Sequence, residues 1–129
     1  PEDVDPLIAP EAQEVLSVVR ALCAHLPEVA EVSQFGKPAW RAGKKTFLTA
    51  SRYRKTMTLS FWVGGELQAM LTADERYHVP AFTGHNGWIA LNVEDMLDKD
   101  EVQHMVMESY RHFALKRMIK ALDAREATN

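Results

Sequence analysis

The sequence predicts a single α+β domain, in which helices pack on an antiparallel sheet. Three observations predict it: helical spacing of apolar residues near both ends, strictly alternating segments between them, and a length of 129 residues that suits one hydrophobic core. The expected order is one helix, three or four strands, a short helix, two strands and a final helix. The domain is expected to span residues 1–129, with tails at about 1–6 and 125–129.

The first helix is predicted to begin at Pro10, because proline suits the first turn of a helix. Its apolar residues recur at spacings of three and four: Leu16, Val19, Cys23 and Leu26. Pro27 then ends the helix. This spacing gives the helix one buried stripe.

The residue pattern in the middle of the chain predicts an antiparallel meander with one solvated face. Residues 56–62 alternate strictly, and their apolar members share one face: Met57, Leu59 and Phe61. Gly64 and Gly65 break this strand. A short helix is expected over residues 66–73, with its apolar residues packed inward: Leu67, Met70 and Leu71.

The second half is predicted to contain a strand over residues 88–93, in which Ile89, Leu91 and Val93 share a face. Asp98 is placed to cap a following helix, and Glu101 stands three residues later, as in a capping box. The apolar pattern then predicts one long closing helix through Val102, Val106, Tyr110, Phe113, Met118 and Leu122.

Positive charge is concentrated in one segment, although the formal net charge of the whole chain is −3. Residues 37–55 contain no acid and seven basic residues: Lys37, Arg41, Lys44, Lys45, Arg52, Arg54 and Lys55. If these residues occupy two successive hairpin turns, an intervening strand of about seven residues separates the turns by roughly 20–25 Å. Together with Lys116 and Lys120 of the last helix, they are the candidate nucleic-acid-binding residues. The alternative is that they serve solubility and block edge-to-edge strand pairing.

A second candidate site is aromatic. Trp88 is out of phase with the apolar face of its strand, and His85 lies between glycines that allow a tight turn. If Trp40, His85 and Trp88 lie together at the surface, they form a cleft suited to a small molecule or a protein partner. If the tryptophans are instead covered by a second layer, they belong to the core.

Several classes of function are not expected. The chain contains no nucleophile elbow, phosphate-binding loop, dinucleotide fingerprint or zinc-protease motif, so neither an enzyme nor a cofactor is predicted. His104, Glu108 and His112 stand four apart on the last helix, which favours a solvated face over a metal site. The lone Cys23, in an apolar stretch, is expected to be a buried thiol. With no apolar run of about 18 residues and no signal segment, a monomer in a reducing cytoplasm is expected.

Several short motifs together resemble the bacterial MmcQ/YjbR family over about residues 25–122: Leu26-Pro27, residues 35–40, Gly43-Lys44-Lys45, residues 84–88, Ser109-Tyr110 and Lys116. The resemblance implies a compact α+β fold related to the frataxin-like architecture, with hairpins similar to a double-wing DNA-binding motif. It therefore implies DNA as the partner, and it supplies no reaction and no catalytic residues. Iron binding of the frataxin type does not carry over, because the acids near the first helix are few and scattered.

Overall fold

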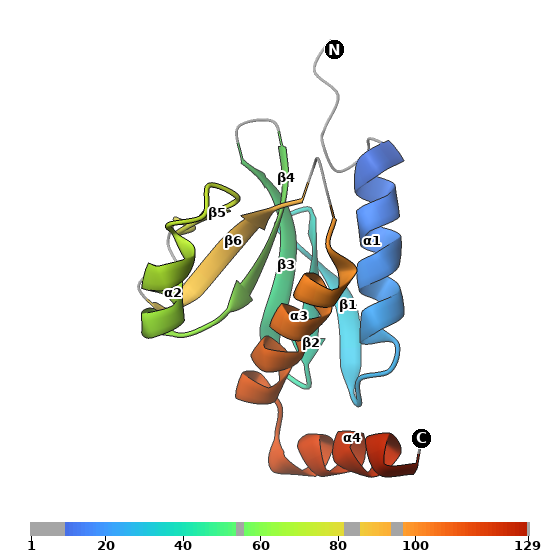
Figure 1. Ribbon diagram of the computed structural model, residues 1–129. Helices are drawn as coiled ribbons and strands as arrows, with labels where there is room; N and C mark the ends of the chain where they lie inside the picture. Colours follow the sequence, from blue (N-terminus) through green and yellow to red (C-terminus); the bar gives the residue numbers. More distant parts are fainter. Residues whose placement is uncertain (1–9, 54–55, 82–85, 94–96, 129) are drawn as a thin grey trace.

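A computed structural model describes residues 10–53, 56–81, 86–93 and 97–128 (Figure 1). The elements in chain order are α1 (Pro10–Cys23), β1 (Val29–Gln34), β2 (Lys37–Ala42), β3 (Lys45–Tyr53), β4 (Thr56–Trp62), α2 (Gly65–Leu71), β5 (Tyr77–His78), β6 (Trp88–Asn92), α3 (Lys99–Phe113) and α4 (Lys116–Thr128). This order confirms the predicted α+β class, with four strands before the short helix and two after it.

The strands form one sheet of six, in the order β1-β2-β3-β4-β6-β5, and every neighbouring pair is antiparallel. Because side chains alternate along a strand, the residues of β4 divide between the two faces of the sheet. Met57, Leu59 and Phe61 are buried on one face, as predicted. Thr58 and Ser60 lie on the other face.

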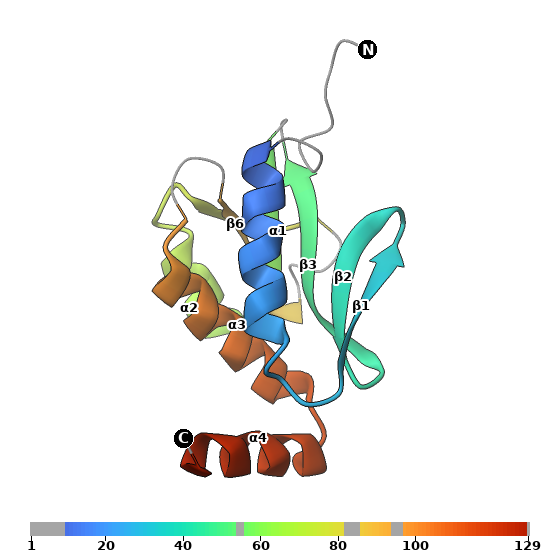
Figure 2. The same ribbon diagram turned by 90° about the vertical axis from the view of Figure 1, so that its right-hand side faces the viewer.

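The helices cover only one face of the sheet. Figure 2 shows α1 and α3 side by side against it, and no described helix lies on the opposite face. Residues from both helices join the hydrophobic core, among them Val19 and Tyr110. The uncovered side, which carries Thr58 and Ser60, is called the outer face below.

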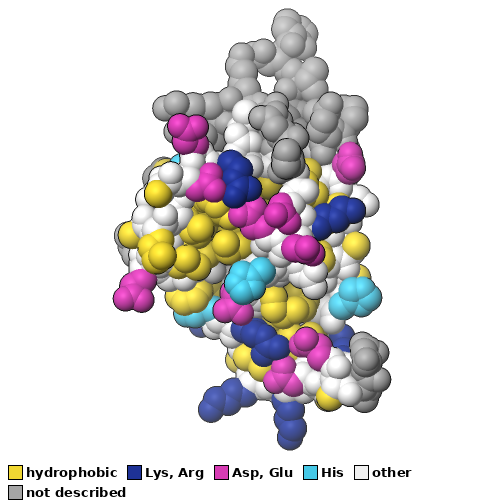
Figure 3. All heavy atoms as spheres, in the orientation of Figure 1, with side chains coloured by type: hydrophobic (Ala, Val, Ile, Leu, Met, Phe, Trp, Pro, Cys, Tyr) yellow, Lys and Arg dark blue, Asp and Glu magenta, His cyan; other side chains and the backbone are white. Residues whose placement is uncertain are grey.

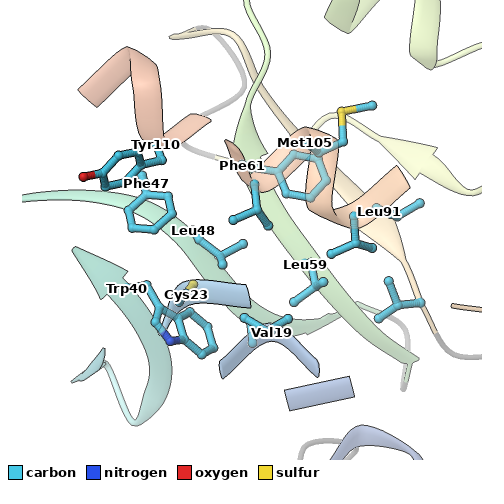
Figure 4. Close-up of a cluster of buried hydrophobic side chains, with 14 of the residues drawn as sticks. Val19, Cys23, Trp40, Phe47, Leu48, Leu59, Phe61, Leu91, Met105 and Tyr110 are labelled. Atoms are coloured by element: carbon cyan, nitrogen blue, oxygen red, sulfur yellow. The ribbon is translucent and has the colours of Figure 1, made fainter. Parts of the chain in front are cut away.

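The core is built between α1, α3 and the covered face of the sheet (Figure 4). Tyr110 meets Phe47 edge to face, with ring centroids 5.5 Å apart. Its hydroxyl donates a 2.7 Å hydrogen bond to the carbonyl oxygen of Pro27, which follows the first helix. Tyr110 of α3 therefore holds the segment that connects α1 to β1.

The single closing helix predicted from the sequence is wrong, because the chain breaks between α3 and α4. Ala114 is extended, with φ −69° and ψ 149°, and α4 starts at Lys116. After this break, Met118 of α4 is fully buried beside the turn at Gly43. Helix α4 continues to Thr128, so residues 125–128, expected to be a tail, are helical.

The inward packing predicted for the short helix is wrong for Leu67 and Met70 and holds for Leu71, which packs against the core. In α2, Leu67 is 36% exposed and Met70 is 71% exposed, while Leu71 is half-buried. Figure 3 shows hydrophobic side chains gathered over the part of the surface where α2 lies. The helix lies beside β6 at the margin of the sheet, where no neighbouring layer covers it.

The cap at the start of α3 is confirmed. Asp98 accepts hydrogen bonds from the backbone amides of Asp100 and Glu101, both at 3.1 Å. The Glu101 carboxylate accepts from the Tyr77 hydroxyl at 2.8 Å and from the Arg76 guanidinium at 2.8 and 3.0 Å. Glu101 therefore joins the short strand β5 to α3.

Candidate functional site

The candidate basic residues divide between the two ends of β3. Lys44 and Lys45 lie at the β2–β3 turn, and Arg52 lies near the other end of the strand. Seven steps of about 3.3 Å separate Lys45 from Arg52 along the chain, roughly 23 Å in all. This spacing matches the separation expected from the sequence. Arg54 and Lys55 lie outside the described residues.

The two remaining basic residues of the segment also separate. Lys37 is the first residue of β2 and lies at the same end of the sheet as Arg52. Arg41 is exposed near the opposite end, where it is paired in register with Thr46. The described part of the basic segment thus forms two groups and no continuous patch.

Helix α4 adds two further lysines to the β2–β3 turn. The Gly43 amide donates a 3.0 Å hydrogen bond to the Glu28 carbonyl, and the Glu28 carboxylate pairs with Arg117 of α4 at 2.8 Å. Lys116 and Lys120 each stand two residues from the buried Met118, so they project from the opposite side of the helix. We call Lys44, Lys45, Lys116 and Lys120 the lysine end; Figure 3 shows basic side chains projecting from the α4 end of the molecule.

Arginines and lysines differ in their partners at this end of the molecule. Arg111 pairs with Asp123 at 2.8 Å and Glu126 at 3.2 Å. Arg117 pairs with Glu28, and its hydrogen bond lowers the pKa of that carboxyl below the ordinary value. Within the described part of the chain, none of the four exposed lysines of the lysine end forms an ion pair. Their charges are therefore available to a polyanion.

The aromatic cleft expected from the sequence is not formed by its three predicted members. Trp40 is 1% exposed and lies in the core with Val19 and Cys23, because its position in β2 faces the helices (Figure 4). Trp88 is half-buried, and its ring lies 5.8 Å from that of Phe113. His85 lies outside the described residues. Trp40 thus belongs to the core, and only Trp88 is described near a surface.

Trp62 packs against α3. Its ring stacks on His112 with centroids 3.5 Å apart and an interplanar angle of 7°, and its indole N–H donates to the Asn86 carbonyl at 2.9 Å. Burial, and then the nearby positive charge of Lys45, lower the pKa of His112. The stack therefore holds a neutral imidazole beside the indole.

A pocket of about 490 Å³ lies on the outer face, a volume in the range of small-molecule sites. Its lining residues come from all six strands and the segment after β5: Gln34, Lys37, Thr46, Thr49, Ser51, Arg52, Thr58, Ser60, His78, Pro80, Ala81, Trp88 and Ala90. The pocket thus brings Lys37 and Arg52, two of the predicted nucleic-acid-binding residues, together with Trp88 of the predicted cleft.

The floor of this pocket is a block of hydroxyl groups. Thr49 pairs with Ser60 and Ser51 pairs with Thr58 across β3 and β4, which places four hydroxyls side by side on the outer face. Thr58 is 3% exposed and Ser60 is 9% exposed. None of these four hydroxyls forms a hydrogen bond among the described residues. Their donors and acceptors therefore face the pocket.

The hydroxyl floor was not identified from the sequence. The polar positions of β4 alternate with Met57, Leu59 and Phe61, and this alternation by itself predicts only a solvated face. The available signal was chemical: an outward face usually carries long charged side chains, whereas Thr58, Ser60 and Ser51 are short hydroxyl residues.

Other kinds of site receive no support from the described residues. No group of three His, Cys, Asp or Glu side chains among them is arranged to hold a metal ion. Among the described helices, none combines the length and the apolar character that crossing a bilayer requires.

A family model named YjbR matches residues 24–112. The chain belongs to the YjbR family. The match includes the whole sheet, the outer-face pocket and all of α3 except Phe113, and it ends before α4. Lys116 and Lys120 of the lysine end therefore lie beyond the part that the YjbR model matches.

The fold of this YjbR protein is similar to that of a solved structure. The crystal structure of the Deinococcus radiodurans protein DR2400, which carries the domain DUF419, matches with a TM-score of 0.66 and 15% sequence identity. The similarity covers 84% of this chain and 87% of that chain. At this identity the likeness establishes the fold alone. No curated protein is significantly similar in sequence.

Proposed function

We propose that this YjbR protein binds DNA without catalysing a reaction on it, and that the lysine end is the surface that contacts the phosphates. The observation that carries the proposal is the difference in pairing between the basic residues. Arg111 and Arg117 are neutralised by carboxylates, whereas Lys44, Lys45, Lys116 and Lys120 have no described acidic partner.

The arrangement of the lysines supports the proposal. Lys116 and Lys120 stand one helical turn apart, with a rise of about 6 Å between them. Lys44 and Lys45 lie on the turn that packs beside α4 through Gly43 and Met118. Two adjacent elements thus present positive charge at one end of a protein whose net charge is −3. The resemblance of the hairpins to a double-wing motif supports DNA as the polyanion.

The expected binding is dependent on salt and weakly dependent on sequence, because lysine contacts to phosphate position a protein without reading bases. Each phosphate contact contributes about 0.9 to the slope of log K against log salt concentration for duplex DNA. Four contacts therefore predict a slope of about −3.6, and a loss of roughly a hundredfold in affinity between about 50 and 200 mM salt.

Fluorescence anisotropy with a labelled duplex tests the proposal. The double variant Lys116→Gln with Lys120→Gln is expected to bind several-fold more weakly than the wild type, with a salt slope smaller by about 2. The matched control, Arg20→Gln with Lys99→Gln, removes the same charge elsewhere and is expected to keep the wild-type slope. Absence of saturable binding at about 50 mM salt would overturn the DNA proposal. Equal losses in the two double variants would remove the lysine end from it.

A further inference from the structure

We propose that the outer-face pocket binds a nucleotide, with its phosphate toward Lys37 and Arg52 and its base toward Trp88. The cationic part of this pocket lies at the end of β3 opposite to the lysine end, and none of the four lysines of the lysine end is among the pocket's lining residues. The proposal rests on three kinds of chemistry that the fold brings to one hollow: positive charge, a hydroxyl floor and an aromatic wall.

The positive charge lies at the end of the pocket formed by β2 and β3. Lys37 is half-buried at the start of β2, two residues from Ala39, which pairs with Thr49. This register places Lys37 on the outer face beside Ser51. Arg52 follows Ser51 and also lines the pocket. An anionic group seated here meets the ammonium of Lys37 and the hydroxyl of Ser51, which together favour a phosphate or a carboxylate.

The floor supplies hydrogen bonds to the middle of a ligand. Thr49, Ser51, Thr58 and Ser60 form a block of hydroxyls, each of which donates one hydrogen bond and accepts others. Since no side-chain oxygen that is closed off from solvent lacks a partner among the described residues, these hydroxyl oxygens reach the solvent that fills the pocket. Because none of the described residues serves them, a ligand with its own hydroxyl or ether oxygens, such as a sugar, is the complementary partner.

The far wall is flat and largely apolar. Trp88 of β6 lines the pocket together with Pro80 and Ala81, which follow β5. Its ring also contacts that of Phe113, with centroids 5.8 Å apart. A planar base is the natural occupant of such a wall, since stacking on an aromatic ring tolerates every base.

The spacing of these groups selects a ligand of defined length. Strand β6 is the third neighbour from β2 in the sheet, so the strands lie about 14 Å apart. The register also sets Lys37 level with Thr58, four residues or about 13 Å along β4 from Trp62, the partner of Trp88. The backbone positions of Lys37 and Trp88 therefore lie roughly 19 Å apart, and a ligand that contacts both long side chains has to be elongated, as a nucleotide is. An inorganic anion fills only the cationic end, and a nucleoside fills only the floor and the aromatic wall. The same chemistry is present in a free nucleotide and in one nucleotide of a single strand.

Isothermal titration calorimetry with thymidine monophosphate, thymidine and inorganic phosphate tests the proposal on the full chain. Thymidine monophosphate is expected to bind in a one-to-one ratio, and at least about tenfold more tightly than either of its halves. No heat of binding with thymidine monophosphate, or equal binding of phosphate alone, would overturn the nucleotide assignment.

Variants locate the site. Lys37→Gln is expected to weaken thymidine monophosphate about tenfold, the effect of losing one hydrogen bond to a charged group, and to leave thymidine unchanged. The double variant Thr58→Val with Ser60→Ala is expected to weaken both ligands. Lys120→Gln, at the lysine end, is the matched control and keeps wild-type binding. Thermal unfolding of each variant verifies that it is folded. Unchanged binding in both pocket variants would place the ligand elsewhere and refute the assignment.

A short single-stranded oligothymidine distinguishes the two sources of nucleotide. Binding more than about tenfold tighter than that of the mononucleotide, and lost in Lys37→Gln, assigns the pocket to a strand. Equal or weaker binding assigns it to the free nucleotide. The nucleotide proposal and the duplex proposal fail separately, because Lys37→Gln affects only the pocket whereas the substitutions at Lys116 and Lys120 affect only the lysine end.

Discussion

Ser109 of α3 donates a 2.6 Å hydrogen bond to the carbonyl oxygen of Phe47 in β3. The same hydroxyl oxygen accepts a 3.0 Å hydrogen bond from the backbone amide of Trp62 in β4. Ser109 is fully buried, so one side chain serves the polar backbone groups of two strands at the place where the helix crosses them. Among the described residues, every side-chain nitrogen or oxygen that is closed off from solvent has a hydrogen-bond partner.

Replacing Ser109 by Ala is expected to destabilise the protein by about 2 kcal/mol, because a buried carbonyl and a buried amide each lose a partner. Urea unfolding measures the change in the free energy of unfolding. Ser33→Ala, at an exposed position in β1, is the control and is expected to change it by less than about 0.5 kcal/mol. A loss as small as that in Ser109→Ala would show that the hydrogen bonds are replaced.

Replacing Gly87 by a residue with a side chain is expected to destabilise the fold. Its φ is +89°, and a Cβ atom there would lie 2.9 Å from the Cα of Gly64. Its carbonyl also accepts hydrogen bonds from Val63 and Gly64 at 2.9 and 3.0 Å. We expect Gly87→Ala to lower the midpoint of thermal unfolding clearly, with at least about 1–2 kcal/mol from the left-handed backbone alone.

Gly65→Ala is the matched control for that substitution. Gly65 starts α2, and a Cβ atom at this position has no neighbour within 4 Å. Alanine also forms helices more readily than glycine, so this variant is expected to be as stable as the wild type or slightly more stable. Similar midpoints for the two alanine variants would contradict the close contact at Gly87.

We expect Phe35 to lower the free energy of unfolding relative to a residue that suits its turn, although its side chain is large and apolar. It is 93% exposed and has a φ of 54°, and it is followed by Gly36 with a φ of 77°. Asparagine tolerates this conformation and suits a tight hairpin turn before glycine. Phe35→Asn should therefore raise the free energy of unfolding by about 1 kcal/mol. Phe35→Ala removes the ring but keeps the backbone strain, and should give no such gain.

His112 should make stability depend on mildly acidic pH. Its folded-state pKa is lowered by burial against Trp62 and by Lys45, so the neutral form is favoured in the fold. The unfolded chain then takes up a proton first as the pH falls below about 6.5. This contribution to stability is present above that pH and is lost as the pH falls through the folded-state pKa. The wild type should lose more unfolding free energy between about pH 7 and 5.5 than His112→Gln does. Parallel curves for the two proteins would contradict this role.

Cys23 should be unreactive in the native protein. Burial raises the pKa of its thiol to about 12, and the side chain is 5% exposed. Because only the thiolate attacks, a disulfide reagent at about pH 8 is expected to label the folded protein slowly and the denatured protein at once. The control is Ala24→Cys in a Cys23→Ala background, which places a thiol at the exposed neighbouring position and should react quickly when folded. Equally fast labelling of the native wild type would show that α1 opens readily.

Local patterns were sufficient to predict most elements. The alternation of Met57, Leu59 and Phe61 identifies both β4 and its buried face, since the period of two is a property of the strand itself. The break between α3 and α4 was missed because Ala114 and Leu115 are good helix formers and neither glycine nor proline marks the position. The exposure of Met70 was missed because helical spacing does not reveal whether a neighbouring layer exists.

The candidate site was less predictable, because it depends on pairings between distant residues. The sequence leaves Trp40 open between a surface cleft and the core, and only the orientation of β2 decides that it faces the core. The hydroxyl floor requires Thr49 to lie beside Ser60 and Ser51 beside Thr58, which is a matter of hairpin register. The separation of Lys45 from Arg52 was predictable, since it follows from the length of a single strand.

The extended backbone at Ala114 makes the last helix a distinct rod, which one side attaches to the rest of the domain. Met118 and Leu122 are buried there, Arg117 pairs with Glu28, Arg111 of α3 pairs with Asp123 and Glu126, and Arg125 donates a hydrogen bond to the His25 carbonyl. Residues on its outward side, such as Lys116 and Lys120, take no part in that attachment. Substitutions at these positions change the electrostatic potential at one end of the molecule and leave the hydrophobic core unaltered. Affinity for a polyanion and thermodynamic stability can therefore evolve independently in this chain.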